Sequence, residues 1–222
     1  MPGPVNIVLS GGGVNGIAHI GALIHLKEGG LLDNVKRIAG TSAGAFIGLG
    51  IVLDFTPKES LEFMASIDFK KFPHSKSYSI TAPITLFTKF GIYSRKYIHE
   101  NIIKLIKQKT GLDNPTFAEL QKHKTKFNLK DFYVTATNMS KRTMKIFSHE
   151  HTPDITVADA IHASMAVPGM FTPMRFKEVN GKLTKHPEGD IFIDGGLLDN
   201  YPLDIFDEQK YQSDYVATTK KK

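Results

Sequence analysis

Short apolar runs that end in glycine-rich turns alternate with helix-like stretches over the first quarter of the chain. The runs Asn6–Ser10 and Val35–Ala39 each meet such a turn, and both are typical of buried strands. A stretch with the pattern of a helix follows each turn, first Ile17–Leu26 and then Ala45–Leu53. Strand, turn and helix, repeated twice in this order, predict a parallel sheet with helices packed on it.

The rest of the chain predicts further elements of both kinds. In chain order these are helices over Lys58–Phe69, Ser94–Lys109 and Thr116–Gln121, a hairpin of Phe132–Thr137 with Thr143–Phe147, a helix over Thr156–Ala166, a strand at Ile191–Ile193 and a helix from Tyr201. The segment Lys70–Tyr93 mixes aromatic residues with lysines and is interrupted by two prolines. We expect an irregular insertion over residues 70–93, a candidate lid or membrane-facing segment. No linker divides the chain, so residues 1–222 are expected to form a single domain.

The composition is that of a globular protein, and it excludes every reaction or site that needs cysteine. Of the 222 residues, 41% are hydrophobic and 23% are charged, which argues against disorder. Cysteine is absent, so disulfides, thiolate nucleophiles and cysteine-bound zinc are excluded. The longest apolar run, Ala43–Leu53, is too short to span a bilayer, and the N-terminus lacks the pattern of a signal peptide. We therefore expect a cytoplasmic or peripheral membrane protein.

The net charge of +6 favours anionic partners. Lipid headgroups, nucleic acid and phosphorylated metabolites all carry such charge, but no nucleic-acid-binding motif is present, so no nucleic-acid partner is expected. Together with the lysines and aromatic residues of segment 70–93, the charge predicts contact with an anionic membrane surface. Nothing in the pattern indicates an oligomeric state.

The pentapeptide Gly40-Thr41-Ser42-Ala43-Gly44 matches the G-x-S-x-G sequence of a nucleophile elbow. The glycines Gly40 and Gly44 allow a sharp turn from strand into helix, which presents the Ser42 hydroxyl at its apex. The N-terminus of the following helix favours negative charge that develops beside this serine. The pentapeptide alone leaves two interpretations open, an ordinary strand-to-helix loop and a catalytic nucleophile.

Two other glycine turns follow apolar runs, and strand ends of this kind gather functional groups at one edge of a sheet. The loop Gly11-Gly12-Gly13-Val14-Asn15-Gly16 would present backbone N–H groups to an oxyanion or a phosphate. The turn Asp194-Gly195-Gly196 would offer a carboxylate that accepts the serine proton.

The first loop also matches G-x-G-x-x-G, which makes a non-catalytic nucleotide- or phosphate-binding protein the alternative function. A dinucleotide site expects an acidic residue at the end of the second strand, where this chain has Gly40-Thr41-Ser42. A P-loop expects Gly-Lys followed by Ser or Thr after the glycine run, and this is missing too.

A Ser-His-Asp triad in the α/β-hydrolase order is disfavoured because no histidine follows Asp194. A triad in another order stays open, since an earlier acid, Asp154 or Asp159, could pair with a histidine. The histidines considered for that role are His149, His151, His162 and His186. No spacing of zinc ligands appears, so neither a metal nor a cofactor is expected.

Four segments together resemble the patatin-like phospholipases, lipid acyl hydrolases with a Ser-Asp dyad. They are Gly11–Gly16, Gly40–Gly44, Ala163–Pro173 with the sequence ASMAVPGMFTP, and Asp194-Gly195-Gly196, and the resemblance extends from Ile7 to about Pro202. It implies a three-layer α/β/α fold around a mainly parallel sheet.

The resemblance also implies the roles of the site residues. Ser42 would be the acylated nucleophile, Asp194 its general base, and the N–H groups around Gly12, Gly13 and Val14 an oxyanion hole. The implied activity is that of a serine esterase of the phospholipase A type, acting on phospholipids or other acyl esters. Because aspartate is a weak base in water, this mechanism predicts a partly buried site.

Two features depart from the family pattern. The family carries Arg or Lys before the last glycine of its first loop, where this chain has Asn15, a neutral donor without positive charge. The chain also ends sooner after Asp194 than such domains commonly do, which predicts a compact relative or a domain truncated at its C-terminal end.

Overall fold

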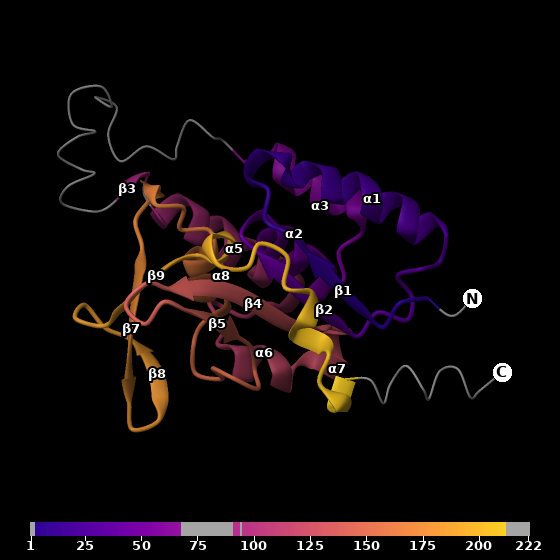
Figure 1. Cartoon of the computed structure of the whole chain (residues 1–222). Helices are drawn as coiled ribbons and strands as arrows, with labels where there is room; N and C mark the ends of the chain where they lie inside the picture. The colour runs from indigo at the N-terminus through magenta and orange to yellow at the C-terminus, as the bar shows by residue number, and fades with distance from the viewer. Residues whose placement is uncertain (1–2, 68–90, 94, 212–222) are drawn as a thin grey trace.

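The computed structural model describes residues 3–67, 91–93 and 95–211, which form a mixed sheet with helices packed on it (Figure 1). Seven strands have the order β1-β2-β4-β9-β7-β8, with β5 paired to β4. Their bounds are β1 Asn6–Leu9, β2 Arg37–Thr41, β4 Asp131–Asn138, β5 Thr143–Phe147, β7 Met174–Val179, β8 Lys182–Lys185 and β9 Asp190–Asp194. A second, two-stranded sheet pairs β3 (Gly91–Tyr93) with β6 (Gly169–Phe171) in parallel.

The parallel part of the large sheet is its core of β1, β2 and β4. The strands β5, β9, β7 and β8 are joined to it by antiparallel pairing. The α/β class with a parallel core is therefore confirmed, and antiparallel strands extend it. The hairpin of β7 and β8 was not predicted, because its strands are short and largely polar.

The predicted helices follow the expected order with shifted ends, and the short helix α7 was not predicted. The longer ones are α1 Ile17–Glu28, α2 Ala43–Val52, α3 Pro57–Ala65, α5 Arg95–Thr110 and α8 Val157–Ser164, and the short ones are α6 Phe117–Lys122, α7 Lys124–Phe127 and the 3-10 turns η1 Gly13–Gly16, η3 Gly195–Leu197 and η4 Leu203–Phe206. The second strand ends at Thr41 and not at Ala39, because Gly40 and Thr41 still pair with β4. The helix predicted from Tyr201 is only the 3-10 turn η4.

The candidate lid over residues 70–93 lies outside the described residues except for β3. The same holds for the last residues of the helix that was predicted to continue to Phe69. Within the described ranges, none of the helices is long and apolar enough to cross a membrane.

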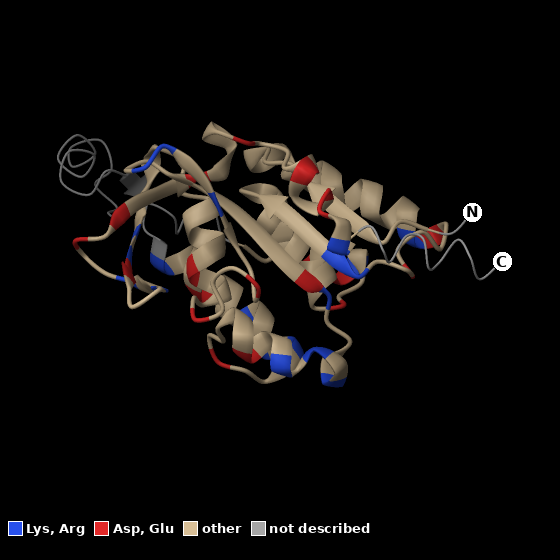
Figure 2. Cartoon of the chain, turned by 60° about the horizontal axis from the view of Figure 1, so that its bottom comes forward, with Lys and Arg blue, Asp and Glu red and all other residues tan. Residues whose placement is uncertain are grey.

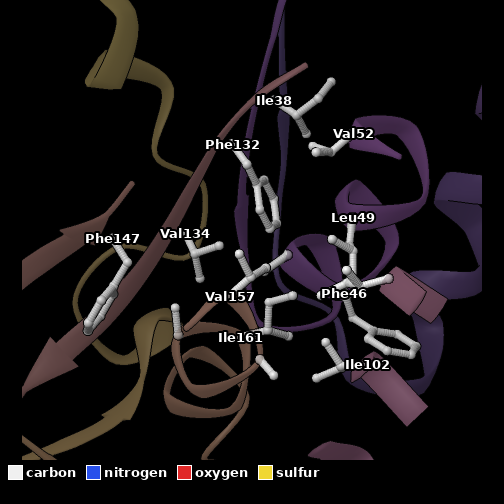
Figure 3. Packing of buried hydrophobic residues seen from close by; sticks show 14 of the residues in the cluster. Ile38, Phe46, Leu49, Val52, Ile102, Phe132, Val134, Phe147, Val157 and Ile161 are labelled. Carbon is white, nitrogen blue, oxygen red and sulfur yellow. The ribbon is translucent and has the colours of Figure 1, made fainter. Parts of the chain in front are cut away.

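The main core lies between one face of the sheet and the helices α2, α5 and α8 (Figure 3). α2 contains no polar residue, and all but one of its ten residues are buried. The side chains labelled in Figure 3 are Ile38, Phe46, Leu49, Val52, Ile102, Phe132, Val134, Phe147, Val157 and Ile161. Burial of each such side chain stabilises the fold by about 1.5–3 kcal/mol, so the helix that follows Ser42 is held in place by an extensive apolar contact.

The opposite face of the sheet carries Ala39 and Tyr133, because side chains alternate along a strand. Residues near the end of the described chain cover it. The rings of Phe206 and Tyr211 meet the Tyr133 ring edge-on at centroid distances of 5.1 and 5.9 Å.

Glu150 fixes this cover by accepting three hydrogen bonds. The hydroxyls of Tyr133 and Tyr211 donate to its two carboxylate oxygens at 2.7 Å, and Lys210 Nζ donates at 2.8 Å. Burial alone would raise the pKa of Glu150, but these three donors outweigh it and lower the pKa to about 2. The carboxylate therefore stays charged and keeps the last described segment on the sheet.

Substitution by alanine at two glycine positions in helices should have opposite effects on the free energy of unfolding. A Cβ at Gly44 would lie 2.3 Å from the Leu9 carbonyl oxygen, so Gly44→Ala forces α2 away from β1 and should lower the free energy of unfolding by about 3 kcal/mol. A Cβ at Gly21 in α1 meets nothing within 4 Å, so Gly21→Ala should raise it by about 0.5–1 kcal/mol. Urea unfolding of both variants checks the pair. Equal effects would show that α2 does not approach β1 this closely.

Candidate active site

Two strands run toward each other along one edge of β4 and bring Ser42 and Asp194 together. β2 is parallel to β4 and its last residue, Thr41, pairs with Thr135. β9 is antiparallel to β4 and its last residue, Asp194, pairs with the next position, Ala136. Since β5 takes the other edge of β4 at both positions, the C-terminal ends of β2 and β9 face each other. The strand ends converge as predicted, but through opposed strands and not through parallel neighbours.

Ser42 occupies the sharp turn between β2 and α2. Its φ of 53° and ψ of −121° are unusual for a residue with a side chain, and such a conformation costs about 1–3 kcal/mol. The turn is too tight for a side chain at Gly40, where a Cβ would lie 2.6 Å from the Ala45 nitrogen. Ser42 is 7% exposed, and its hydroxyl donates a hydrogen bond of 2.6 Å to Asp194 Oδ2.

Asp194 is 6% exposed, and the other oxygen of its carboxylate is also bonded. Gly196 N–H donates to Asp194 Oδ1 at 2.7 Å, and the Asp194 N–H donates to the Ala166 carbonyl at 3.0 Å. Burial raises the pKa of Asp194, and the hydrogen bonds from Ser42 and Gly196 only partly oppose this. The carboxylate is thus fixed in position and more basic than an exposed aspartate.

The glycine loop lies beside Ser42 and offers three of its six N–H groups. A Cβ at Gly11 would lie 3.3 Å from Ser42 Cβ. The Asn15 N–H donates to the Gly12 carbonyl at 3.0 Å, which is the first hydrogen bond of η1. Gly12, Gly13 and Val14 come before Asn15 in the chain, and no described residue accepts a hydrogen bond from their N–H groups.

The other members of the loop have structural contacts. Gly11 N–H donates to the Asn200 carbonyl at 3.0 Å, and Asn15 N–H is used within η1. Gly16 is buried against α2, where a Cβ would lie 2.7 Å from Ala43 Cβ. The Asn15 side chain is exposed and brings no positive charge to the loop.

Asn200 joins the glycine loop to the turn that carries Asp194. Its Nδ2 donates to the Gly11 carbonyl at 3.2 Å, and its own carbonyl accepts from Gly11 N–H. A Cβ at Gly11 or Gly196 would lie 2.3 or 2.8 Å from Asn200 Oδ1, so this oxygen sits between the two loops. Sequence reasoning did not single out Asn200, because its partner is 189 residues away.

Ser164 is the second residue that sequence reasoning missed. Its Oγ is buried at the end of α8 and accepts the Ser42 N–H at 2.7 Å. Ser164 belongs to Ala163–Pro173, one of the four segments that carry the family resemblance, and its side chain here holds the backbone of Ser42. No local pattern distinguishes this serine from others on the chain.

The four histidines considered for a triad contact groups other than Ser42 and Asp194. His162 Nε2 contacts the Thr172 carbonyl, His151 Nδ1 contacts Ser148 Oγ, His149 lies 3.8 Å from Glu150, and His186 Nδ1 accepts from Glu188 N–H. The structure describes no hydrogen bond from a histidine to Ser42 or Asp194, so the alternative triad is not assembled.

The two acids considered for the triad are paired with cationic or histidine side chains. Asp154 lies 3.1 Å from Lys182. Burial would raise the pKa of Asp159, but hydrogen bonds from His99 and Lys185 outweigh it and lower the pKa to about 2. Over the described ranges, no group of three His, Asp or Glu side chains is arranged to hold a metal ion.

Comparison with known proteins gives one family. A family model described as patatin-like phospholipase matches residues 7–207. An uncharacterised protein of Acanthamoeba polyphaga mimivirus is 29% identical over 204 residues, which are 91% of this chain and 61% of the relative. A probable lipid hydrolase of Invertebrate iridescent virus 6 is 26% identical over 201 residues, 90% of this chain and 62% of the relative. The chain thus spans about three fifths of the length of these relatives.

A solved structure has the same fold. VipD from Legionella pneumophila superposes with a TM-score of 0.62 at 18% identity, and the match covers 90% of this chain and 47% of VipD. The likeness supports the arrangement of sheet and helices described above.

Ser164→Ala should leave the buried Ser42 N–H without an acceptor. We expect the free energy of unfolding to fall by about 1–3 kcal/mol. The exposed Ser66, whose hydroxyl donates to the Phe63 carbonyl, provides the control variant Ser66→Ala, with an expected change below about 0.5 kcal/mol. Urea unfolding compares the two, and equal stabilities would contradict the role given to Ser164.

Asp194→Asn should stabilise the fold at neutral pH. The folded-state pKa of Asp194 lies above its ordinary value of 3.8, so the folded chain binds this proton more tightly than the unfolded chain. The free energy of unfolding therefore falls as pH rises from that value through the folded pKa. Asparagine stays neutral, keeps an acceptor for Gly196 N–H and avoids this loss.

Thermal unfolding across pH checks this prediction. The variant should exceed the parent at neutral pH, and the difference should shrink as the pH falls below both pKa values. Asp204→Asn, at an exposed position, controls for the change in net charge. A parent that is more stable than Asp194→Asn at neutral pH would contradict the raised pKa of this buried carboxylate.

Proposed function

This chain belongs to the patatin-like phospholipase family, and from that premise we propose that it is a serine esterase of the phospholipase A type. It cleaves fatty acyl esters of phospholipids through Ser42 and Asp194, with an acyl-enzyme intermediate. The observation that carries the proposal is the 2.6 Å hydrogen bond from Ser42 Oγ to Asp194 Oδ2 beside the glycine loop. The viral relative described as a probable lipid hydrolase supports the same class of reaction.

The first half of the reaction transfers the acyl group to the enzyme. Asp194 Oδ2 accepts the Ser42 proton along the hydrogen bond that already joins them while Oγ attacks the ester carbonyl carbon. Negative charge then develops on the carbonyl oxygen, and the N–H groups of Gly12, Gly13 and Val14 stabilise it. When the tetrahedral intermediate collapses, the C–O bond of the leaving group breaks, and Asp194 returns the proton to the departing alkoxide.

The second half releases the fatty acid. A water molecule gives its proton to Asp194 as its oxygen attacks the acyl carbonyl, and the same N–H groups stabilise the second oxyanion. Ser42 leaves with the proton held by Asp194, which regenerates the starting hydrogen bond. One carboxylate thus acts first as base and then as acid in each half of the reaction.

The raised pKa of Asp194 suits this role. A general base works best when its pKa approaches the working pH, and burial moves this aspartate in that direction. Gly196 N–H holds Oδ1, so Oδ2 stays directed at the serine. Catalysis needs the carboxylate charged, so the rate should fall as the pH falls through this raised pKa.

Backbone N–H groups alone stabilise the oxyanion in this proposal, because Asn15 supplies no charge. Each such donor contributes about 10²–10³ in rate. The alternative, phosphate or nucleotide binding by the same loop without catalysis, would use these N–H groups but would have no use for the bond between Ser42 and Asp194. Because a lipid substrate is held in a bilayer, peripheral contact with a membrane forms part of the proposal.

Loss of either member of the dyad should abolish ester hydrolysis. Ser42→Ala removes the nucleophile, and Asp194→Asn removes the base, so each should lower the rate on a phospholipid and on a short-chain ester by about 10⁴-fold or more. Ser66→Ala serves as the matched serine control. Full activity in either dyad variant would contradict the assignment.

A serine-directed fluorophosphonate separates the esterase from the phosphate-binding alternative. We expect covalent labelling of the parent at Ser42, mapped by peptide mass spectrometry, and no labelling of Ser42→Ala. A parent that binds phosphate or nucleotide with a gain in unfolding temperature, but is not labelled, would favour the alternative.

A further inference from the structure

Large apolar side chains are exposed on the two loops that lie beside the candidate active site. Val14 is 83% exposed and Ile17 is 53% exposed at the start of η1 and α1, and Leu197, Leu198 and Tyr201 are 56%, 51% and 49% exposed after Asp194. We name these five residues the apolar rim. Soluble proteins rarely expose such side chains in groups, and a group of this kind marks a contact surface.

Contacts with Asn200 show that the two loops of the rim are neighbours. The Asn200 carbonyl and Nδ2 pair with both backbone groups of Gly11, and its Oδ1 lies between Gly11 and Gly196. Gly11 in turn lies beside Ser42. The rim therefore lies on the two loops that flank Ser42 and Asp194.

The rim carries no positive charge. Residues 11–19 and 195–206, which form the two loops, contain no lysine or arginine, and they include Asp199 and Asp204. Lysines gather instead on α6 and α7, toward the bottom of the view in Figure 2. There Lys124 bonds to Asp131 at the start of β4, the end of that strand remote from the dyad.

From this distribution of charge and exposure we propose that the apolar rim docks the enzyme on the surface of a zwitterionic lipid bilayer. The proposal rests on the proposed function, because the docked surface supplies the substrate. The free energy of leucine, isoleucine and valine side chains falls when they enter the boundary between headgroups and acyl chains. Tyrosine also favours the headgroup region of the bilayer. Anionic headgroups would meet Asp199 and Asp204, so they add nothing at this surface.

This differs from the expectation drawn from net charge alone. A charge of +6 favours anionic lipid wherever the basic residues face it. At the rim, contact with an anionic bilayer would place Asp199 and Asp204 opposite negatively charged headgroups, and the two would repel each other. Docking by the rim should therefore depend on apolar contact and be nearly insensitive to salt, in contrast to docking by lysines.

The test measures binding of the chain to phosphatidylcholine vesicles by flotation, with and without phosphatidylserine, at low and high salt. The parent should bind the neutral vesicles with little effect of salt. The double variant Ile17→Ser with Leu198→Ser should bind at least about tenfold more weakly, since two exposed apolar side chains are lost. Tyr201→Ser provides an independent variant, with a smaller loss expected.

Val179→Ser is the matched control, because Val179 is 44% exposed but lies at the end of β7, away from the rim. It should bind as the parent does. Unfolding temperatures of all variants within about 2 °C of the parent would show that the folds are intact.

Three outcomes would overturn the proposal. One is unchanged binding of the rim variants, and another is parent binding that needs phosphatidylserine and is lost at high salt. The third is a parent that is a dimer in solution and becomes monomeric in the double variant without loss of vesicle binding, which would make the rim an interface between copies. Hydrolysis of a water-soluble short-chain ester by the parent is measured separately, so a failure of the proposed function is distinguished from a failure of docking.

Discussion

The opposition of β2 and β9 along one edge of β4 is the constraint on which the site depends. Each strand is fixed by its pairing, and the two meet at adjacent positions, Thr135 and Ala136. The turn after β9 also packs closely on β4, since a Cβ at Gly195 would lie 2.7 Å from the Thr135 carbonyl oxygen. The short contact between Ser42 and Asp194 is thus a product of backbone geometry, and loop adjustment plays little part in it.

The geometry of the proposed dyad opposes stability, and the rest of the fold compensates. Ser42 has a strained backbone, and among the described residues no cation pairs with the buried carboxylate of Asp194. Two other carboxylates have surroundings that lower the pKa instead. Glu150 and Asp159 are held by basic partners or hydroxyls, and their pKa values are lowered to about 2. Asp194 alone among these three is left basic, and the apolar core around α2 supplies the stability that this requires.

The sequence predicts well those features that local pattern encodes. The parallel core, the apolar helix after Ser42 and the family follow from runs of apolar residues and glycine turns, and all are confirmed. The roles of Ser42, Asp194 and the glycine loop are a prediction that the geometry supports and that only activity can test. The direction of β9 could not be predicted, because a short apolar run does not reveal whether its neighbour is parallel.

Other features of the structure were not predicted from the sequence, each for a physical reason. The hairpin of β7 and β8 has polar strands, although Asn180-Gly181, both with positive φ, is a strong signal for a two-residue turn and could have revealed it. Ser164 and Asn200 act on partners 122 and 189 residues away, a separation at which one sequence gives no signal.

The pairing of Asn200 with Gly11 also orders the events of folding. Ser42, α2 and β4 all belong to the first two thirds of the chain, whereas Asp194 and Asn200 come close to the end of the described residues. Long-range contacts of this kind form late, because the intervening chain must first be ordered. Under the proposed mechanism, a partly synthesised chain that lacks β9 contains Ser42 without Asp194 or Asn200, so it hydrolyses no ester until β9 has paired with β4.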